Sequence, residues 1–261
     1  MEESMAIIPF VRLSGATVER EREGVYVKYS SDPKQWEFLN QQALYMAECG
    51  KPFVEVIGIA HGRYWMKEYG IRARGDHAQT IIDAKRSLQQ LWSGKRRYID
   101  NNWTNAHRNR LQELCEMNSV GVQITSRLAD LFERNVVENS HKLTVCAAIH
   151  GDATISNALY DSDGSVRWID PIPPSLWLPA FKAVDLGKLM QSSHGWEFSM
   201  NNWDLPERCD DAVFSDENVV DMMAAHYFHV LCYLRILRYA KEGDHAHNYA
   251  MNKLDELLLN S

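Results

Sequence analysis

Hydrophobic and polar positions in the first seventy residues alternate mostly in the manner of β-strands. The clearest run is Gly24-Val-Tyr-Val-Lys-Tyr29, in which apolar and polar side chains alternate. Three further short runs have the same character, at residues 10–13, 53–59 and 63–67. The pattern therefore predicts several short strands in this part of the chain.

One helix is expected between these strands, from about Pro33 to Cys49. Trp36, Leu39, Ala43 and Met46 fall at helical spacing, and Gly50 follows as a stop signal. The first part of the chain is therefore predicted to be a small antiparallel sheet that carries one helix.

Beyond Gly70 the apolar spacing changes to that of long helices. One helix is expected after a capping Asp76 and ends at Ser93-Gly94, because Ile81, Leu88 and Trp92 share a face. Two more helices are predicted, at about 119–137 and 220–237. The fold class is therefore α+β, with a sheet lobe at residues 1–69 and a mainly helical lobe at residues 70–261, joined near Met66 to Gly70.

A hairpin is predicted between the second and third of these helices. Residues 157–160 and 166–170 read as strands around the turn Ser162-Asp163-Gly164. Because the hairpin brings its two outer ends together, Asn157 and Asp170 should lie side by side, and Asp152 lies in the loop that leads into the first strand.

These three polar side chains suit phosphoryl transfer. Asn157 offers a neutral oxygen and Asp170 an anionic one, and Mg²⁺ commonly takes one or two protein oxygens together with substrate phosphates. Asp152 then remains to accept a proton from a hydroxyl nucleophile. The sequence therefore predicts Asp152 as a catalytic base and Asn157 and Asp170 as metal ligands.

The run His150-x-Asp152-x-x-x-x-Asn157, followed by Ile169-Asp170, resembles the signature of the aminoglycoside phosphotransferase and choline-kinase-like superfamily. The His-Gly-Asp form is similar to the small-molecule branch of that superfamily, and Val184-Asp185-Leu-Gly-Lys-Leu189 is similar to its buried Asp-Leu segment. The resemblance implies a two-lobed, protein-kinase-like fold that uses ATP and Mg²⁺. It also implies that His150 and Asp185 support the catalytic loop.

The resemblance extends to the sheet lobe. Lys28 matches the lysine that contacts the α- and β-phosphates of ATP, and Ser14 and Gly15 sit where the loop that covers the nucleotide should turn. The glycine pattern of this loop departs from the usual form, because only Gly15 and the more distant Gly24 are present.

Two further sites in the sheet lobe follow from the resemblance. Glu37 is the acid expected to pair with Lys28, although the usual spacing falls nearer Asn40 or Gln41, which carry no charge. The segment from Trp65 to Tyr69, which includes Lys67, is expected to be the hinge whose backbone binds adenine.

The implied acceptor is the hydroxyl of a small molecule. A sugar or amino sugar is the first choice, because Ile169-Asp170-Pro171 resembles the Ile-Asp-Pro segment of sugar and amino-sugar kinases of this superfamily. An aminoglycoside or a choline-like amino alcohol is the alternative, and a pseudokinase that binds nucleotide for regulation is a second alternative. Candidate acceptor contacts are Trp196 and an acidic cluster after Pro206, which consists of Glu207, Asp210, Asp211, Asp216 and Glu217.

Composition narrows the class of protein further. The 261 residues are 45% hydrophobic and 24% charged, as in ordinary globular domains. A net charge of −7 argues against a nucleic-acid partner. The N-terminus lacks the pattern of a secretory signal, and the five cysteines are scattered singly. We therefore expect a soluble cytoplasmic protein with no membrane partner, and the oligomeric state is left open.

Overall fold

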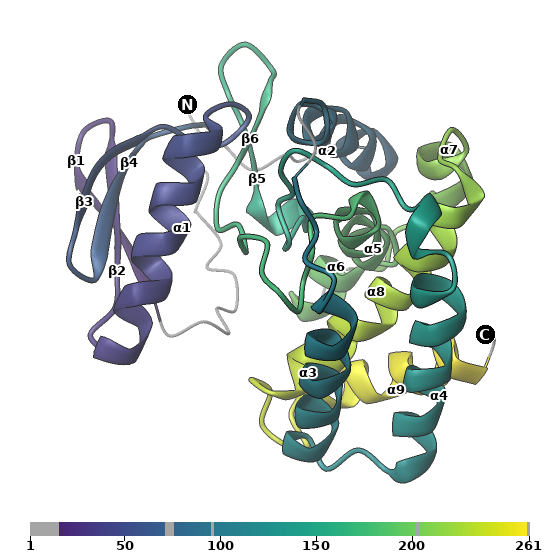
Figure 1. Ribbon diagram of the computed structural model, residues 1–261. Helices are drawn as coiled ribbons and strands as arrows, with labels where there is room; N and C mark the ends of the chain where they lie inside the picture. The colour runs from purple at the N-terminus through teal and green to yellow at the C-terminus, as the bar shows by residue number, and fades with distance from the viewer. Residues whose placement is uncertain (1–15, 71–75, 95–96, 202–203, 260–261) are drawn as a thin grey trace.

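The structure, a computed structural model, describes residues 16–70, 76–94, 97–201 and 204–259. Figure 1 shows a sheet with one helix on one side of the molecule and a larger group of helices on the other, with a hairpin between them. This arrangement confirms the predicted fold class, a small antiparallel sheet with one helix followed by a mainly helical part.

The sheet lobe contains four antiparallel strands in the order β1-β2-β4-β3. Helix α1 packs against β3 and β4 through Leu39, Ala43 and Met46, as its apolar spacing predicted. It begins after a 3-10 turn and ends at Gly50, whose φ of 63° few other residues adopt readily. The elements are β1 Thr17–Arg22, β2 Val25–Tyr29, the 3-10 turn Pro33–Gln35, α1 Trp36–Cys49, β3 Val56–Ala60 and β4 Arg63–Lys67.

Two strand predictions need correction. β1 was not anticipated, because most of its side chains are exposed and polar. The strand expected at 53–59 begins only at Val56, since Phe53 forms a bridge with Trp168 and the Val54 N–H donates to the Trp168 carbonyl at 3.0 Å. The run at 10–13 and the loop residues Ser14 and Gly15 lie outside the described residues.

The helical lobe is built around two buried helices, α5 and α8, which pack against each other. Gly187 of α5 makes close packing possible, since a Cβ atom there would lie 2.7 Å from the Ala225 carbonyl oxygen. The α-helices of this lobe are α2 His77–Trp92, α3 Trp103–Met117, α4 Val122–Phe132, α5 Lys182–Ser193, α6 Trp196–Met200, α7 Asp210–Phe214, α8 Val219–Leu237 and α9 His245–Leu259.

The three helices predicted in this lobe are present. Asp76 caps α2 by accepting from the Ala78 N–H at 2.9 Å, and α8 spans the third predicted segment. The helix expected at 119–137 is α4 followed by a π-helical turn, Glu133–Val137. Helix α3 was missed because its buried face includes His107, a residue that the apolar pattern does not count.

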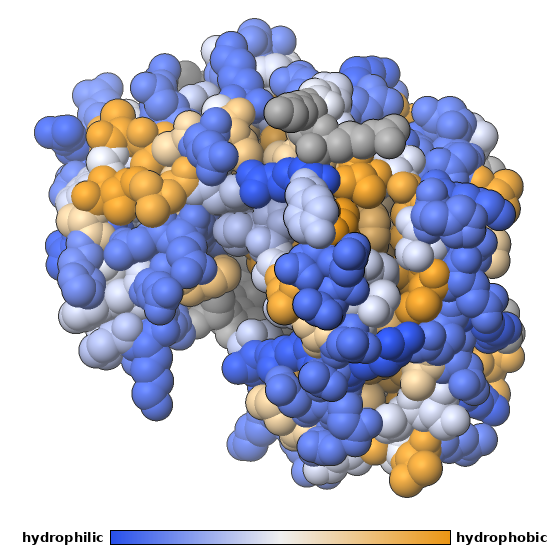
Figure 2. All heavy atoms as spheres, in the orientation of Figure 1, coloured by the Kyte–Doolittle hydropathy of each residue, from blue (hydrophilic) through white to orange (hydrophobic). Residues whose placement is uncertain are grey.

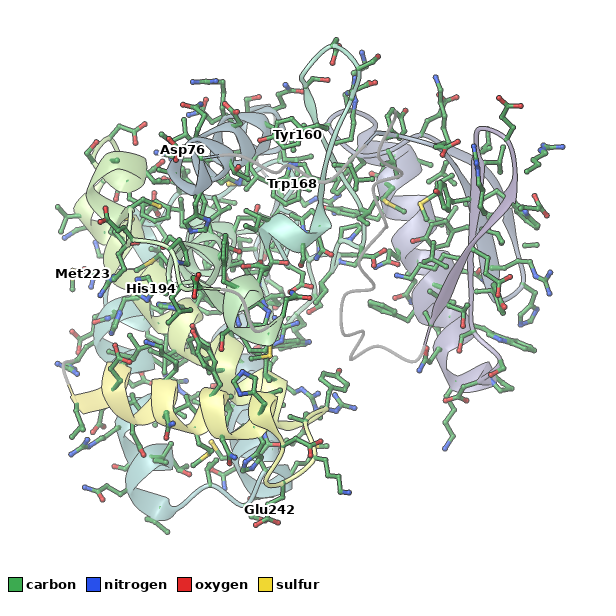
Figure 3. The ribbon with its side chains drawn as sticks, turned by 180° about the vertical axis from the view of Figure 1, so that it is seen from behind. Asp76, Tyr160, Trp168, His194, Met223 and Glu242 are labelled. Carbon is green, nitrogen blue, oxygen red and sulfur yellow. The ribbon has the colours of Figure 1, made fainter. Side chains whose placement is uncertain are left out.

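The hairpin consists of β5 Ala158–Tyr160 and β6 Val166–Trp168, with the 3-10 turn Ile155–Asn157 before it; a further 3-10 turn is Ser140–Lys142. Figure 3 shows Tyr160 and Trp168 on this hairpin, between the two lobes. The lobe junction passes beside it, because a Cβ atom on Gly70 would lie 2.6 Å from the Tyr160 carbonyl oxygen. Among the described residues, no helix combines the length and the apolarity that a bilayer crossing requires.

The close approach of α5 and α8 makes a testable prediction. Replacing Gly187 by Ala should lower the free energy of unfolding by about 1–3 kcal/mol, because the new methyl group meets backbone that cannot move aside, although Ala is the better helix former. Gly121→Ala is the matched control, since nothing lies within 4 Å of its Cβ position, and it should cost less than about 1 kcal/mol. Equal losses of unfolding free energy for the two variants, measured by equilibrium urea denaturation, would contradict this account.

Candidate active site

The loop that begins at His150 is fixed by the imidazole of that residue. His150 is fully buried, its Nε2 lies 2.8 Å from the Ile169 carbonyl oxygen, and its Nδ1 accepts from the Asp152 N–H at 3.2 Å. These partners place the ring proton on Nε2. Burial lowers the pKa of His150 to about 4, so the ring is neutral at physiological pH. His150 therefore ties the loop to the end of the hairpin.

Asp185 on α5 holds the same loop from the other side. Its carboxylate accepts from the His150 N–H at 3.0 Å, the Gly151 N–H at 2.7 Å and the Trp92 indole N–H at 2.9 Å. Burial raises the pKa of Asp185 to about 6, even though all three donors favour the ionised form. Gly151 has a φ of 74°, and a Cβ atom there would lie 2.2 Å from the Ile172 carbonyl oxygen, so the turn requires glycine.

Asp152 and Asn157 are joined directly. The Asn157 amide nitrogen donates to the Asp152 carbonyl oxygen at 2.9 Å and lies 3.2 Å from Asp152 Oδ2. A backbone carbonyl can only accept, so this contact fixes the orientation of the amide. The Asn157 Oδ1 atom is then directed away from Asp152, and it has no hydrogen-bond partner among the described residues. It is available to a cation.

Asp170 meets Lys28 across the boundary between the lobes. Asp170 follows β6 by two residues and has a φ of 59°, an uncommon conformation for a residue with a side chain. Its Oδ1 accepts from the buried Lys28 ammonium on β2 at 2.7 Å. Because the Ile169 N–H donates to the Asn157 carbonyl at 3.0 Å, the hairpin brings Asn157 and Asp170 to the same end.

The helix residue that contacts Lys28 is Gln42, and Glu37 does not pair with it. Gln42 Oε1 accepts from the Lys28 ammonium and from the Tyr64 hydroxyl, each at 3.0 Å, and its Nε2 donates to the Pro171 carbonyl at 2.7 Å. Glu37 is exposed and accepts from Gln41 at 3.1 Å. It lies five residues before Gln42, so the two side chains point to different faces of α1. The prediction for Glu37 is corrected accordingly.

The predicted hinge lies at the end of β4. The Lys67 N–H donates to the Glu55 carbonyl at 2.9 Å and the Glu68 N–H to the Gly24 carbonyl at 2.8 Å, so both are used within the sheet lobe. The Lys67 ammonium and the Arg167 guanidinium each lie 5.8 Å from the centroid of the Tyr69 ring. Contact of this segment with adenine stays a prediction.

The candidate acceptor contacts lie in the helical lobe. Trp196 is half-buried and packs near Tyr249, with 5.8 Å between the ring centroids. Asp210 accepts from Ser193 at 2.5 Å and from Arg208 at 2.6 Å, and it lies 2.8 Å from His194 Nε2. Figure 3 shows His194 on the side of this lobe away from the sheet.

Two more members of the acidic cluster are paired. Lys85 pairs with Asp216 and Glu217, and Lys182 pairs with Glu217 as well. Glu207 is exposed, and the side chain of Asp211 lies outside the described part of the chain. The ion pairs therefore hold the segment after α7 against α2 and α5.

Lys188, like Gln42, was missed by sequence reasoning. Lys188 on α5 places its ammonium 2.8 Å from Asp152 Oδ1. Burial alone would raise the pKa of Asp152, but Lys188 and then Arg235 outweigh it and lower that pKa to about 2. The only signal in the sequence is that Lys188 follows Asp185 by three residues, which puts both on one helix face.

The arrangement as a whole brings four predicted residues to one place between the lobes. Lys28 and Asp170 are bonded to each other, as are Asp152 and Asn157, and the hairpin joins the two pairs. Figure 2 shows the surface hollowed between the sheet lobe and the helical lobe. A nucleotide and a second substrate could therefore approach these residues from the gap between the lobes.

No protein-family model and no curated protein sequence matches the chain. Solved structures do match in fold. A choline kinase, LicA, from Streptococcus pneumoniae has a TM-score of 0.62 at 12% identity and covers 95% of this chain and 90% of its own. The GDP complex of an aminoglycoside 2'-phosphotransferase-IIIa has a TM-score of 0.58 at 11% identity, with coverages of 97% and 95%. An ethanolamine kinase from Plasmodium vivax has a TM-score of 0.51 at 12% identity, with coverages of 95% and 81%. The chain therefore has the two-lobed kinase-like fold of the choline kinase and aminoglycoside phosphotransferase structures.

Proposed function

We propose that the protein transfers the γ-phosphoryl group of ATP to a hydroxyl group of a small molecule. The observation that carries the proposal is the bonded set Lys28–Asp170 and Asp152–Asn157 at the boundary of the lobes. The fold supports it, because the similar structures are small-molecule kinases and one of them is a GDP complex. The acceptor oxygen would bond to the γ-phosphorus as its proton passes to Asp152 and ADP leaves.

The charge of each side chain determines its role in the proposed reaction. Asp152 is ionised at neutral pH, because Lys188 and Arg235 overcome the effect of burial and hold its pKa at about 2, so it can accept a hydrogen bond from the acceptor hydroxyl. Lys28 donates to Asp170 and Gln42, which leaves its third N–H for a phosphate oxygen. His150 and Asp185 keep the loop in place without touching the reacting atoms.

The residues fit a magnesium ion. Asn157 offers an unpartnered carbonyl oxygen and Asp170 a carboxylate, which are the hard oxygen ligands that Mg²⁺ prefers. An ion held by these two residues would take its remaining ligands from phosphate and water. When bound, the ion would neutralise charge on the nucleotide phosphates.

A sugar or amino sugar is our first choice of acceptor. The resemblance of the Ile169-Asp170-Pro171 segment to sugar kinases supports it. The similar structures include kinases of choline, ethanolamine and aminoglycosides, which keeps a cationic amino alcohol or an aminoglycoside as the alternative. Three acids of the cluster, Asp210, Asp216 and Glu217, are already paired with basic side chains, which leaves less of its charge for such a cation. Measuring ADP release from ATP with sugars, amino sugars, aminoglycosides and amino alcohols would decide between them, and no turnover with any acceptor would reject the proposal.

The role of Asp152 gives the first activity prediction. Asp152→Asn should lower kcat by about 10²–10⁴-fold, because the amide cannot accept the proton from the acceptor. Asp163→Asn is the matched control, since Asp163 lies in the exposed turn of the same hairpin and its Oδ1 accepts from the Ser165 N–H. It should leave ADP release unchanged. Wild-type turnover by Asp152→Asn would rule out Asp152 as the base.

The proposed metal site predicts a strict dependence on divalent cations. EDTA should abolish ADP release and Mg²⁺ should restore it. Asn157→Ala should raise the Mg²⁺ concentration for half-maximal rate at least about tenfold, because one ligand is lost. Asn139→Ala is the control, since that amide only donates to the Arg134 carbonyl on the surface. Full activity in excess EDTA would contradict the prediction.

The contacts of Gln42 predict a role in binding ATP. Gln42→Leu should lower kcat/KM for ATP by about tenfold, because Lys28 loses its neutral acceptor and the Pro171 carbonyl loses its donor. Gln41→Leu and Glu37→Gln are controls on the exposed side of the same helix, and each should change this ratio by less than about twofold. A larger effect for Glu37→Gln than for Gln42→Leu would reverse the assignment.

A further inference from the structure

Lys188 contacts the proposed catalytic base from the helix that also fixes the catalytic loop. It lies three residues after Asp185, so both side chains leave the same face of α5. Its ammonium is 2.8 Å from Asp152 Oδ1 and 3.0 Å from Gln191 Oε1, and only 8% of the side chain is exposed. The backbone of the loop and the carboxylate of the base are therefore held by one rigid element.

The helix that carries Lys188 is itself firmly placed. Gly187, the preceding residue, brings the α5 backbone against α8. A Cβ atom on Gly187 would lie 2.8 Å from the backbone nitrogen of His229. Asp185 adds hydrogen bonds to the loop and to Trp92 on α2. A side chain on such a helix has few alternative positions, so Lys188 can define where the Asp152 carboxylate lies.

Lys188 and Asp152 both carry their charges in the folded protein. Burial would lower the pKa of Lys188, but the neighbouring Asp152 carboxylate prevails and the pKa is raised. The other charged or titratable groups that act on the pair are Arg235 and Cys232 on α8, His150 in the loop, Asp185 on α5 and Glu197 on α6. Without Lys188, the partly exposed Asp152 carboxylate would lack its ion-pair partner, and without Asp152 the buried Lys188 ammonium would lack its own, so the contact is costly to break.

We propose that Lys188 is a positioning residue for phosphoryl transfer: its ammonium fixes Asp152 Oδ1, while the Asn157 amide lies beside Oδ2. This inference rests on the proposed function. With a contact to each oxygen, the orientation of the carboxylate is restricted, and each oxygen keeps acceptor capacity for a hydroxyl group. A hydroxyl nucleophile then meets a base that needs no reorientation, which is the kind of placement that enzymes use to gain rate.

Two other roles for Lys188 make different predictions. An ion pair that only stabilises the fold would matter for unfolding and not for rate at temperatures where the protein is folded. An ammonium that contacts the transferred phosphoryl group directly would act independently of Asp152. A double-mutant cycle with Asp152 separates all three, because only a residue that acts through Asp152 loses its effect when Asp152 is replaced.

The test measures ADP release from ATP, with water as acceptor and with any acceptor found in the screen, for wild type, Lys188→Met, Asp152→Asn and the double variant. Lys188→Met should lower kcat by about 10- to 100-fold with KM for ATP changed less than about threefold. In the Asp152→Asn background, the same change should lower the remaining rate by less than about twofold. Lys188→Arg, which keeps the cation, should retain more activity than Lys188→Met.

Thermal unfolding of the same four proteins tests the pairing without activity. The double variant should lose less Tm than the sum of the single variants, because it leaves neither an unpaired carboxylate nor an unpaired buried ammonium. Lys182→Met is the matched control on α5, where the lysine pairs with Glu217 and lies over the Trp92 ring; the Met thioether can still pack against that ring. The same change at both positions allows a direct comparison, and Lys182→Met should leave kcat unchanged.

Each result has one meaning. Additive Tm losses would overturn the pairing whatever the activity. Wild-type kcat for Lys188→Met, or equal rate losses in both backgrounds, would overturn the positioning role. If the wild-type protein turned over no ATP, the phosphotransferase proposal would fail and the positioning role with it, while coupled Tm losses would identify a purely structural ion pair.

Discussion

The buried carboxylate of Asp185 is the interaction on which the candidate site depends. It lies in the interior and accepts from two successive N–H groups of the loop that begins at His150, and from the Trp92 indole. Burying a carboxylate costs free energy unless the carboxylate accepts hydrogen bonds. Here the three donors are themselves N–H groups that need an acceptor. The loop, α2 and α5 are therefore fixed together, and Asp152 follows directly after the two residues that Asp185 holds.

Much of the fold was predictable from the sequence, because its buried faces have regular spacing. The spacing of Leu39, Ala43 and Met46 predicted α1, and Asp76 marked the start of α2. Helix α3 was not predictable in this way, since His107 occupies a core position. That imidazole lies 2.5 Å from the Trp177 carbonyl oxygen and 2.6 Å from the Tyr227 hydroxyl, and burial lowers its pKa to about 4. A polar residue with satisfied partners packs like an apolar one, and pattern alone does not reveal this.

Part of the candidate site was likewise predictable from local sequence, and part was not. Asp152, Asn157 and Asp170 were predicted because they lie in the segments that flank one short hairpin, whose register follows from local sequence. Gln42 and Lys188 were missed because they contact residues at least 14 and 36 positions away in the chain, and those contacts depend on how helices pack. The error at Glu37 has the same origin, because a preference for a charged partner selected a residue on a different face of α1 from Gln42, which contacts Lys28.

The presence of glutamine rather than glutamate at position 42 affects the net charge of the site. Lys28 has one anionic partner, Asp170, and Lys188 is paired with Asp152, so these four residues sum to zero charge. A glutamate at position 42 would add a negative charge beside the place where phosphates are expected, and it would lose the donor that reaches the Pro171 carbonyl. With an amide there, Asp170 is the only anion bonded to Lys28 among the described residues. Any cation that engages Asp170 would weaken its hold on Lys28, so metal and phosphate binding should favour each other across the lobe boundary.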